Sequence, residues 1–319
     1  MAQALEAVYR QDGNAIDYTP AAAVEGGDVL QMPDGRAGVA ITDIAASVKG
    51  AFQVTGIARV LKTASVVVLN GAQIWWDHSA NTATPVPQYA DKDFYLGHAV
   101  ADAAAADTEC DVNLNARPSY IIDLQRDGGD TAVVLTAGTP YIYSRGGSME
   151  AGFSATAEAQ KLDWLSKRSF PLASNWILDA IVDVVTNCDA DVGDLNIGVA
   201  NGTHASDADS ITESAFFHLD MGADLNIDAK STDGTTSVTA TDTTLDWVLG
   251  TPFLLTLDGR DHTNVKYYVN GVEVLSATAN LGDIQLATGP LKALFHLEKS
   301  SNDSPGVVQL DHFTVRITE

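Results

Sequence analysis

The segment Val24-Glu25-Gly26-Gly27-Asp28-Val29 opens a run of short apolar blocks that decides the fold of the first third of the chain. The later blocks are Gly38-Val39-Ala40, Gly56-Ile57-Ala58-Arg59-Val60, Gly71-Ala72-Gln73-Ile74-Trp75-Trp76-Asp77, Tyr95-Leu96-Gly97-His98-Ala99-Val100 and Cys110-Asp111-Val112-Asn113-Leu114. Short apolar segments bounded by Gly, Asp and Asn are typical of β-strands, and none is long enough for an ordinary helix. Residues 24–118 are therefore predicted to form a small all-β domain.

Two features inside this domain predict local structure. The β-branched run Ser65-Val66-Val67-Val68-Leu69 suits a buried strand. Trp75 and Trp76 are adjacent, so on a strand their side chains point to opposite faces. One tryptophan then belongs to the core and the other to an interface, where tryptophan is enriched; we assign Trp76 to the interface.

Residues 156–319 read as a second β-domain. Trp176–Val185 is a long apolar strand, and Phe313–Ile317 alternates cleanly. Asn270-Gly271 predicts a two-residue type I′ hairpin that pairs Val269 with Val272 and Tyr267 with Val274. Strands of this kind with Gly, Asn and Asp turns predict a β-sandwich. The spacing of Leu162 and Leu165 predicts one short helix over Ala157–Lys167.

Residues 119–155 are read as a connector with some strand, and they contain the domain boundary. Two apolar runs, 120–124 and 132–135, flank Asp127-Gly128-Gly129-Asp130, a pattern that suggests a hairpin.

The order of the blocks in residues 24–118 resembles the small β-domain of tailed-phage capsid cement (head decoration) proteins. The resemblance implies a β-barrel-like fold and a homotrimer that binds the major capsid protein at local threefold positions outside the head. The second domain is similar to concanavalin- and laminin-G-like jelly rolls, found in lectins and some glycosidases. That weaker resemblance depends on the hairpin Tyr267-Tyr268-Val269-Asn270-Gly271 and on the closing strand Leu310–Val315.

Residues 1–23 read as an N-terminal arm with two open interpretations. One is a frayed terminus, and the other is an extended arm that becomes ordered on a neighbouring subunit. Large apolar residues are numerous for a free tail. The predicted capsid interface consists of five of them together with one tryptophan: Leu5, Val8, Tyr9, Ile16, Tyr18 and Trp76.

Charge and hydropathy exclude several partners. The formal net charge is −24, and both halves are acidic, so phosphate backbones would repel the chain and nucleic-acid binding is excluded. No apolar run reaches the roughly 18 residues of a membrane span. The start Met1-Ala2-Gln3-Ala4-Leu5-Glu6 lacks the features of a signal peptide. We expect synthesis in the host cytoplasm, where Cys110 and Cys188 stay reduced.

The chain shows no sequence pattern of a catalytic site. It has no phosphate-binding Gly-x-x-x-x-Gly-Lys loop, no Gly-x-Ser-x-Gly, and no Glu-x-Asp-x-x-Glu strand of sandwich-fold glucanases. Acidic turns at 189–194 and 207–209 only faintly resemble calcium loops, since the closing glutamate is missing. We expect no enzyme activity, cofactor or metal, although a bound calcium remains open. Tyr268 is a candidate glycan contact, because the hairpin places its side chain on the face of the sheet away from Tyr267.

These observations predict a virion protein that cements the outer surface of the capsid and stabilises the major capsid protein lattice. The alternative is a carbohydrate-binding or receptor-binding phage surface protein, such as a tail component, that uses the sandwich. In that case host or environmental glycans would be the partners.

Overall fold

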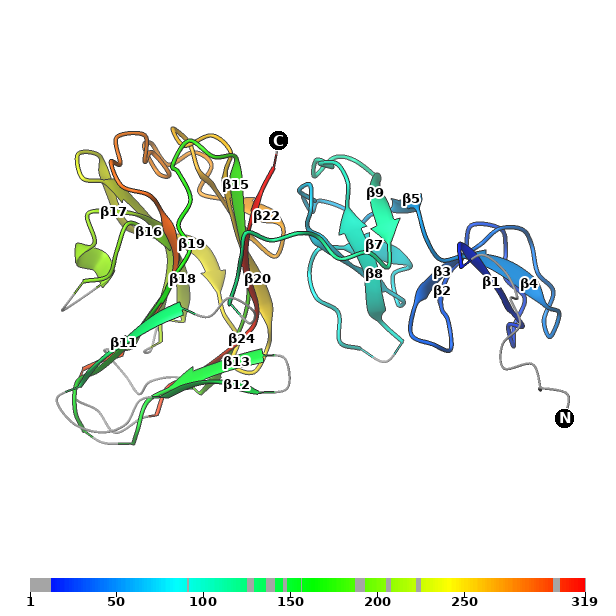
Figure 1. Cartoon of the computed structure of the whole chain (residues 1–319), viewed down its shortest axis with the longest axis horizontal. Coiled ribbons are helices and arrows are strands. Elements are labelled where there is room, and N and C mark those ends of the chain that lie inside the picture. Colours follow the sequence, from blue (N-terminus) through cyan, green and yellow to red (C-terminus); the bar gives the residue numbers. More distant parts are fainter. Residues whose placement is uncertain are drawn as a thin grey trace, which may run out of the picture. The chain divides into compact units, whose positions relative to one another are not determined.

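The computed structural model describes residues 13–90, 92–124, 129–135, 141–145, 148–155, 157–186, 193–204, 208–221, 225–300 and 305–318. The chain divides into two compact units, Met1–Pro118 and Ser119–Glu319 (Figure 1). Regular structure in the described residues consists of strands in four sheets and a short 3-10 helix, η1 (Ala208–Ser210), which confirms the predicted all-β class. None of the described helical segments has the length and apolarity of a membrane span.

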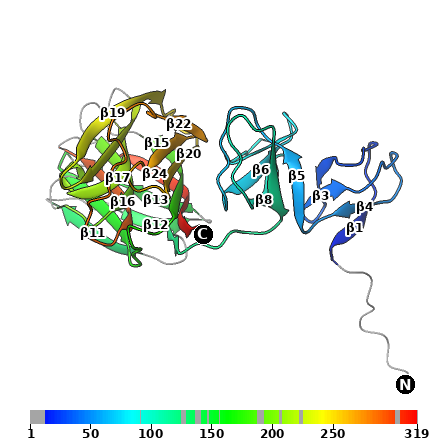
Figure 2. The ribbon, with the colours of Figure 1, turned by 90° about the horizontal axis from the view of Figure 1, so that it is seen from above.

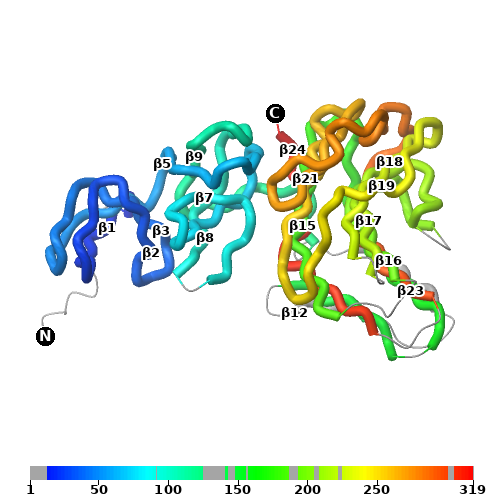
Figure 3. Tube along the Cα trace, turned by 180° about the vertical axis from the view of Figure 1, so that it is seen from behind, coloured from blue at the N-terminus to red at the C-terminus, as the bar shows by residue number. Residues whose placement is uncertain are grey.

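Unit 1 consists of two small lobes, each built on one antiparallel sheet (Figure 3). The first lobe, residues 14–54, has the strand order β1-β4-β3-β2, and the second lobe, residues 56–114, has the order β5-β9-β8-β6-β7. The strands of the first lobe are β1 (Ala15–Tyr18), β2 (Val29–Gln31), β3 (Ala37–Ala40) and β4 (Gly50–Gln53). Those of the second lobe are β5 (Ile57–Leu61), β6 (Gln73–Asp77), β7 (Thr82–Thr84), β8 (Phe94–Ala99) and β9 (Glu109–Leu114). One apolar cluster lies within the first lobe, and the cluster of the second lobe also includes Val29 and Ala37 of the first.

The two lobes repeat one pattern of backbone hydrogen bonds. Val24 and Ile44 exchange backbone N–H···O bonds in the first lobe, and Val68 and Ala103 exchange the same pair in the second. Asp43 accepts the N–H of Gly26 at 2.8 Å, and its counterpart Asp102 accepts the N–H of Asn70 at 2.7 Å. Strands β1, β2, β3 and β4 therefore correspond to β5, β6, β8 and β9, and β7 is an addition to the second lobe. Unit 1 is an internal structural duplication.

Equivalent glycines occupy the same sterically restricted positions in both lobes. Gly27 and Gly71 have positive φ angles of 99° and 78° at the turn before β2 and β6. Gly38 and Gly97 lie opposite Leu30 and Ile74 in the two sheets. A side chain at Gly97 would place its Cβ 2.1 Å from the carbonyl oxygen of Asn113, so only glycine fits there.

Asn115 ties the two lobes together. Its Oδ1 accepts the N–H of Ala37 at 2.7 Å, and its Nδ2 donates to the carbonyls of Ala37 at 2.9 Å and Val54 at 2.7 Å. One side chain thus satisfies three backbone groups of the first lobe from the end of the second.

Replacing Asn115 by alanine is expected to destabilise unit 1 by about 2 to 4 kcal/mol, because it leaves three backbone groups without their partners. Calorimetry of the full chain measures the effect as a lower melting temperature of the unit 1 transition. Asn14→Ala is a suitable comparison, since within the described residues the side chain of the exposed Asn14 accepts a single bond, of 3.1 Å, from Thr55. Equal losses for both variants would contradict the role given to Asn115.

The predicted strand at Ser65–Leu69 is wrong. Val68 forms only an isolated bridge to Ala103, in the position that Val24 occupies in the first lobe. Val66, Val68 and Leu69 of the run are buried, whereas Ser65 is exposed.

Unit 2 is a sandwich of a seven-stranded and an eight-stranded sheet (Figure 2). The seven-stranded sheet has the order β11-β14-β23-β16-β17-β18-β19, and these strands are β11 (Gly129–Leu135), β14 (Gln160–Ser166), β16 (Gly193–Ala200), β17 (Glu213–Asp220), β18 (Asn226–Asp233), β19 (Ser237–Asp246) and β23 (Lys292–Lys299). The other sheet contains β10 (Ile122–Asp123), β12 (Tyr141–Arg145), β13 (Ser148–Gly152), β15 (Trp176–Thr186), β20 (Phe253–Gly259), β21 (Lys266–Val269), β22 (Val272–Val274) and β24 (Val307–Ile317). Their inner faces share one apolar core. This arrangement confirms the predicted jelly-roll-type sandwich.

Of the hairpin and the helix predicted in unit 2, one is confirmed and the other is wrong. The hairpin is confirmed, since β21 and β22 pair Val269 with Val272 and Tyr267 with Val274. The helix predicted over Ala157–Lys167 is wrong, because β14 occupies most of that range and puts Leu162 and Trp164 into the core.

Residues 119–155, expected to be a connector, instead supply β10 to β13 of the sandwich. The unit boundary lies between Pro118 and Ser119. The hairpin predicted around 127–130 does not form, because β10 and β11 belong to different sheets. Both strands find their partners far along the chain, in β24 and β14.

Candidate functional site

The predicted capsid-interface residues of the N-terminal arm divide into two groups. Leu5, Val8 and Tyr9 lie outside the described residues. Ile16 and Tyr18 lie on β1, half-buried, and pack against the core of the first lobe. The ring of Tyr18 meets the ring of Phe52 edge-on, with centroids 5.7 Å apart. These two residues belong in part to the core of their own lobe.

The two tryptophans take the reverse of the roles assigned to them. Trp76 is 5% exposed and belongs to the core of the second lobe, so it offers almost no surface. Trp75, on the other face of β6, is half-buried and packs against Tyr89 and Tyr95 at centroid distances of 6.0 and 5.7 Å. The accessible aromatic surface of this lobe therefore includes the half-buried Trp75 and Tyr95 and the exposed Tyr89.

A groove of about 520 Å³ runs between the two lobes of unit 1. Apolar side chains from both lobes line it, together with the carboxylates of Asp28 and Glu109; the apolar residues are Val29, Leu30, Val39, Val60, Leu61 and Trp76. Ile57 and Leu61 on β5 are 67% and 57% exposed, so large apolar side chains lie in and beside the groove. Between them, Arg59 binds the carboxylate of Asp111 with two bonds of 2.8 and 2.9 Å. We refer to this feature as the interlobe groove.

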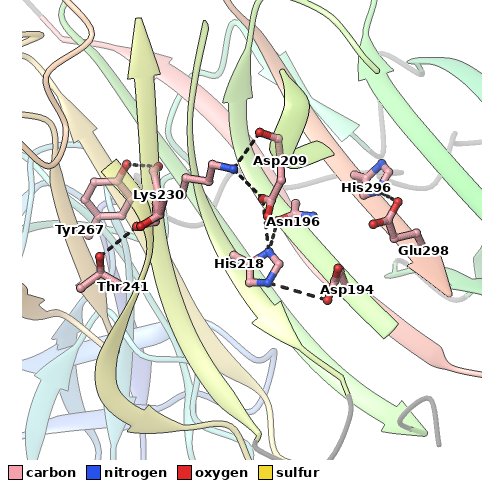
Figure 4. Close-up of polar contacts among 10 residues, drawn as sticks. Asp194, Asn196, Asp209, His218, Lys230, Thr241, Tyr267, His296 and Glu298 are labelled. Carbon is pink, nitrogen blue, oxygen red and sulfur yellow. Dashed lines mark hydrogen bonds and ion pairs between the residues drawn. The ribbon is translucent and has the colours of Figure 1, made fainter. Parts of the chain in front are cut away.

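A second polar feature crosses the seven-stranded sheet of unit 2. Register places one polar residue from each of six strands side by side on the face opposite the core: Asp163, His296, Asn196, His218, Asp228 and Asp242. The alternate residues of the same strands, such as Trp164, Phe295 and Phe217, fill the core. We call the six residues the polar row, and Figure 4 shows its central part.

His296 lies between two carboxylates. Its Nδ1 forms a hydrogen bond with Asp163, and its Nε2 lies 2.9 Å from Glu298. Burial alone lowers the pKa of His296, but the two carboxylates together outweigh burial and raise it above its usual value. The two carboxylates therefore stabilise the imidazolium form of His296 relative to the neutral ring.

His218 organises the next part of the row. Its Nδ1 lies 2.8 Å from Oδ1 of Asn196 and 3.7 Å from Asp209, and its Nε2 lies 3.8 Å from Asp194. Burial raises the pKa of Asp194 to about 6, and Glu298 and Asp209 add to the rise while His218 opposes it. Lys230 forms an ion pair with Asp209 at 3.0 Å. Asn196 is 1% exposed, and its Nδ2 has no hydrogen-bond partner in the described part of the chain.

The predicted glycan contact Tyr268 is buried, with 5% exposure, opposite Thr256 and Glu273 in the sheet. Tyr267 points to the other face and donates its hydroxyl to the carbonyl of Lys230 at 2.8 Å. The hairpin therefore sends the two tyrosines to opposite faces, but neither offers a stacking surface.

The described residues contain no group of three or more His, Cys, Asp or Glu side chains that could hold a metal ion. Of the acidic turns at 189–194 and 207–209, residues 189–192 and 207 lie outside the described residues. Asp194 and Asp209, which are described, face His218.

Sequence reasoning missed both the groove and the polar row. The alternation in His296-Leu297-Glu298 and in Asp194-Leu195-Asn196 was a usable signal for polar residues on one face of a strand. It does not reveal which strands are neighbours, so the row could not be assembled from it.

Similarity to solved structures is low. A structure of endo-acting O-glycanases that members of the human gut microbiota express to initiate mucin breakdown is 13% identical, with a TM-score of 0.44 over 63% of this chain and 100% of that chain. The carbohydrate recognition domain of Emp46p, in its potassium-bound form, is 11% identical, with a TM-score of 0.40 over 61% of this chain and 92% of that chain. The carbohydrate esterase vb_24B_21 of the Shiga toxin-encoding bacteriophage phi24B is 10% identical, with a TM-score of 0.39 over 63% and 99%.

Comparison at the level of sequence concerns unit 1. No curated protein matches the chain. A family does match: residues 10–114, which contain both lobes and the interlobe groove, fit the model of the phage cement protein family.

Proposed function

We propose that the protein is a capsid decoration protein that binds the outside of a phage head and stabilises the lattice of the major capsid protein. The match of residues 10–114 to the phage cement family carries this proposal. The apolar groove and the exposed Ile57 and Leu61 in the same residues support it, since apolar patches on soluble domains mark interaction sites.

The stabilisation would be physical rather than catalytic. A standard interface buries roughly 800 Å² on each partner, and linked footprints bind far more tightly than one alone. We propose a homotrimer at local threefold positions, so that three copies of unit 1 bridge neighbouring capsid subunits. The protein would be made in the host cytoplasm and would bind after the shell has assembled.

Binding of the purified full chain to undecorated, expanded heads tests this function. Cryo-electron microscopy is expected to show added density at the threefold positions of the outer surface, with hundreds of copies per head. A few copies per virion, located on the tail, would instead support the alternative of a receptor-binding tail component.

Glycan binding by unit 2 is a second candidate function. The observation that favours it is the buried amide Nδ2 of Asn196, which has no hydrogen-bond partner among the described residues and lies on a sheet face beside acids and histidines. Asp194 and Asp209 lie near His218 in the same group of polar residues, and their side chains are 31% and 35% exposed. This group therefore reaches the surface of the sheet. A glycan array probed with the full chain is expected to give signals that Asp209→Asn weakens. An array with no signal above background would remove this candidate.

A further inference from the structure

The interlobe groove is bordered by a strand edge where the outward backbone groups of two residues pair with no other strand of the described residues. Lys62 donates its N–H to Thr108, and Leu114 donates to Gly56, which fixes the phase of the β5–β9 ladder. Bonds to β9 therefore come from the even-numbered residues 56, 58, 60 and 62. The N–H and C=O groups of Ile57, Arg59 and Leu61 point away from β9, and β5 is the terminal strand of its sheet. The end of β5 meets β7 through a parallel bridge between Lys62 and Ala83, in which Thr63 donates to Ala83. The open part of the edge is therefore Ile57 and Arg59.

The first lobe has an equivalent free edge at the same groove. Ala40 donates to Asp28, and Met32 donates to Arg36, so the even-numbered residues of β2 bond to β3. The backbone groups of Val29 and Gln31 point away from β3, and β2 is also a terminal strand. Val29 on β2, and Arg59 and Leu61 on β5, line the groove. Two free edges thus border one apolar groove.

We propose that the interlobe groove receives an extended segment of a capsid subunit as an added β-strand, paired through its backbone to the free edge of β5. This inference rests on the proposed function and names the partner segment. Strand addition to a free edge is a common mode of peptide recognition, in which the backbone gives affinity and side-chain pockets give specificity. It also accounts for Ile57 and Leu61, because an exposed apolar edge strand otherwise invites aggregation.

Charge specifies the segment further. The carboxylates of Asp28 and Glu109 line the groove, while the guanidinium of Arg59 is already engaged by Asp111. Residues 1–118 contain 14 acidic residues and 7 Lys and Arg. The segment that fits carries apolar residues at alternate positions and at least one Lys or Arg that meets these carboxylates.

Head binding by matched variants of the full chain tests the groove. Ile57→Ser with Leu61→Ser removes the apolar side chains of the edge and is expected to raise the Kd for undecorated heads about tenfold or more. Ile41→Ser with Val48→Ser is the control, since these residues are 53% and 52% exposed in the same unit but do not line the groove. The control is expected to bind as the unaltered chain does, and equal melting temperatures would show that both variants are folded.

Hydrogen exchange on saturated heads tests the strand itself. The amides of Ile57 and Arg59 are expected to gain protection on binding, whereas those of Ala58 and Val60 are already bonded to β9 and serve as the internal control. If the Ile57→Ser, Leu61→Ser variant saturates heads normally, the groove assignment is wrong and the decoration function stands. If the unaltered chain binds no heads, both fall. If the amides of the β5 edge are already protected before heads are added, another segment of this chain fills the groove. That result would contradict the proposal that a capsid segment binds there.

Discussion

Replacing Arg316 by methionine is expected to lower the free energy of unfolding of unit 2 by about 3 to 5 kcal/mol. Arg316 on β24 and Asp179 on β15 form an ion pair at neighbouring positions of the eight-stranded sheet, and they are 2% and 5% exposed. Thr256 donates a further hydrogen bond of 2.7 Å to Asp179. The single substitution leaves a buried carboxylate without its counter-ion, which is the costly part of breaking such a pair.

The double variant Asp179→Leu, Arg316→Met is expected to lose less than the single one, since no lone charge stays buried. An exposed pair in the same unit gives the comparison: Lys266 and Glu273 lie 3.5 Å apart with side chains 42% and 32% exposed. Lys266→Met should cost under about 1 kcal/mol. Calorimetry of the full chain measures each loss of stability from the unfolding transition of unit 2. An Arg316→Met loss no larger than that of Lys266→Met would contradict the importance of burial.

The features that sequence reasoning predicted correctly are local. Asn270 and Gly271 have positive φ angles of 50° and 74°, as a type I′ turn requires, so two adjacent residues fix the register of the whole hairpin. The long strand at Trp176 and the last strand were likewise visible as apolar runs bounded by turns. Each of these signals depends on neighbours in sequence.

The errors arise where distant partners decide the structure. Leu162 and Leu165 have helical spacing, but they lie on opposite faces of β14, because its partners β11 and β23 impose the period of a strand. Asp163 becomes buried for the same reason, since its partner His296 comes from β23. Periodicity over one turn of helix is too short a signal to outweigh sheet pairing.

The duplication in unit 1 was hidden by low sequence similarity. Few identities relate the lobes, among them Gly27 with Gly71, Gly38 with Gly97 and Asp43 with Asp102. The two lobes share the positions of their backbone hydrogen bonds and of one aspartate that accepts a backbone N–H. These shared positions can be recognised only when the strand pairing is known. The interlobe groove is a consequence of the duplication, because it forms where the two repeats meet.

Asp194→Asn is expected to stabilise unit 2 at pH 8 by about 1 to 2 kcal/mol, allowing for its partial exposure, and to have no effect at pH 4. Burial raises the pKa of this carboxyl from 3.8 to about 6, so the folded state binds the proton more tightly than the unfolded chain. The favourable contribution is complete below the unfolded pKa and disappears as the pH rises through about 6. Above that, the ionised carboxylate opposes folding, and asparagine has no such charge.

Urea unfolding of the full chain at both pH values measures the difference. The raised pKa of His296 makes the stability of unit 2 fall with rising pH in the same direction, but it does so equally in both proteins and cancels from the comparison. Asp246→Asn, at an exposed position on β19 of the same sheet, should change stability by less than about 0.5 kcal/mol at either pH. A gain from Asp194→Asn that is the same at pH 4 and pH 8 would show that its origin is not the carboxylate charge. A gain confined to high pH would instead show that the sheet holds an energetically unfavourable carboxylate beside the polar row at neutral pH, as a site retained for binding rather than for stability would do.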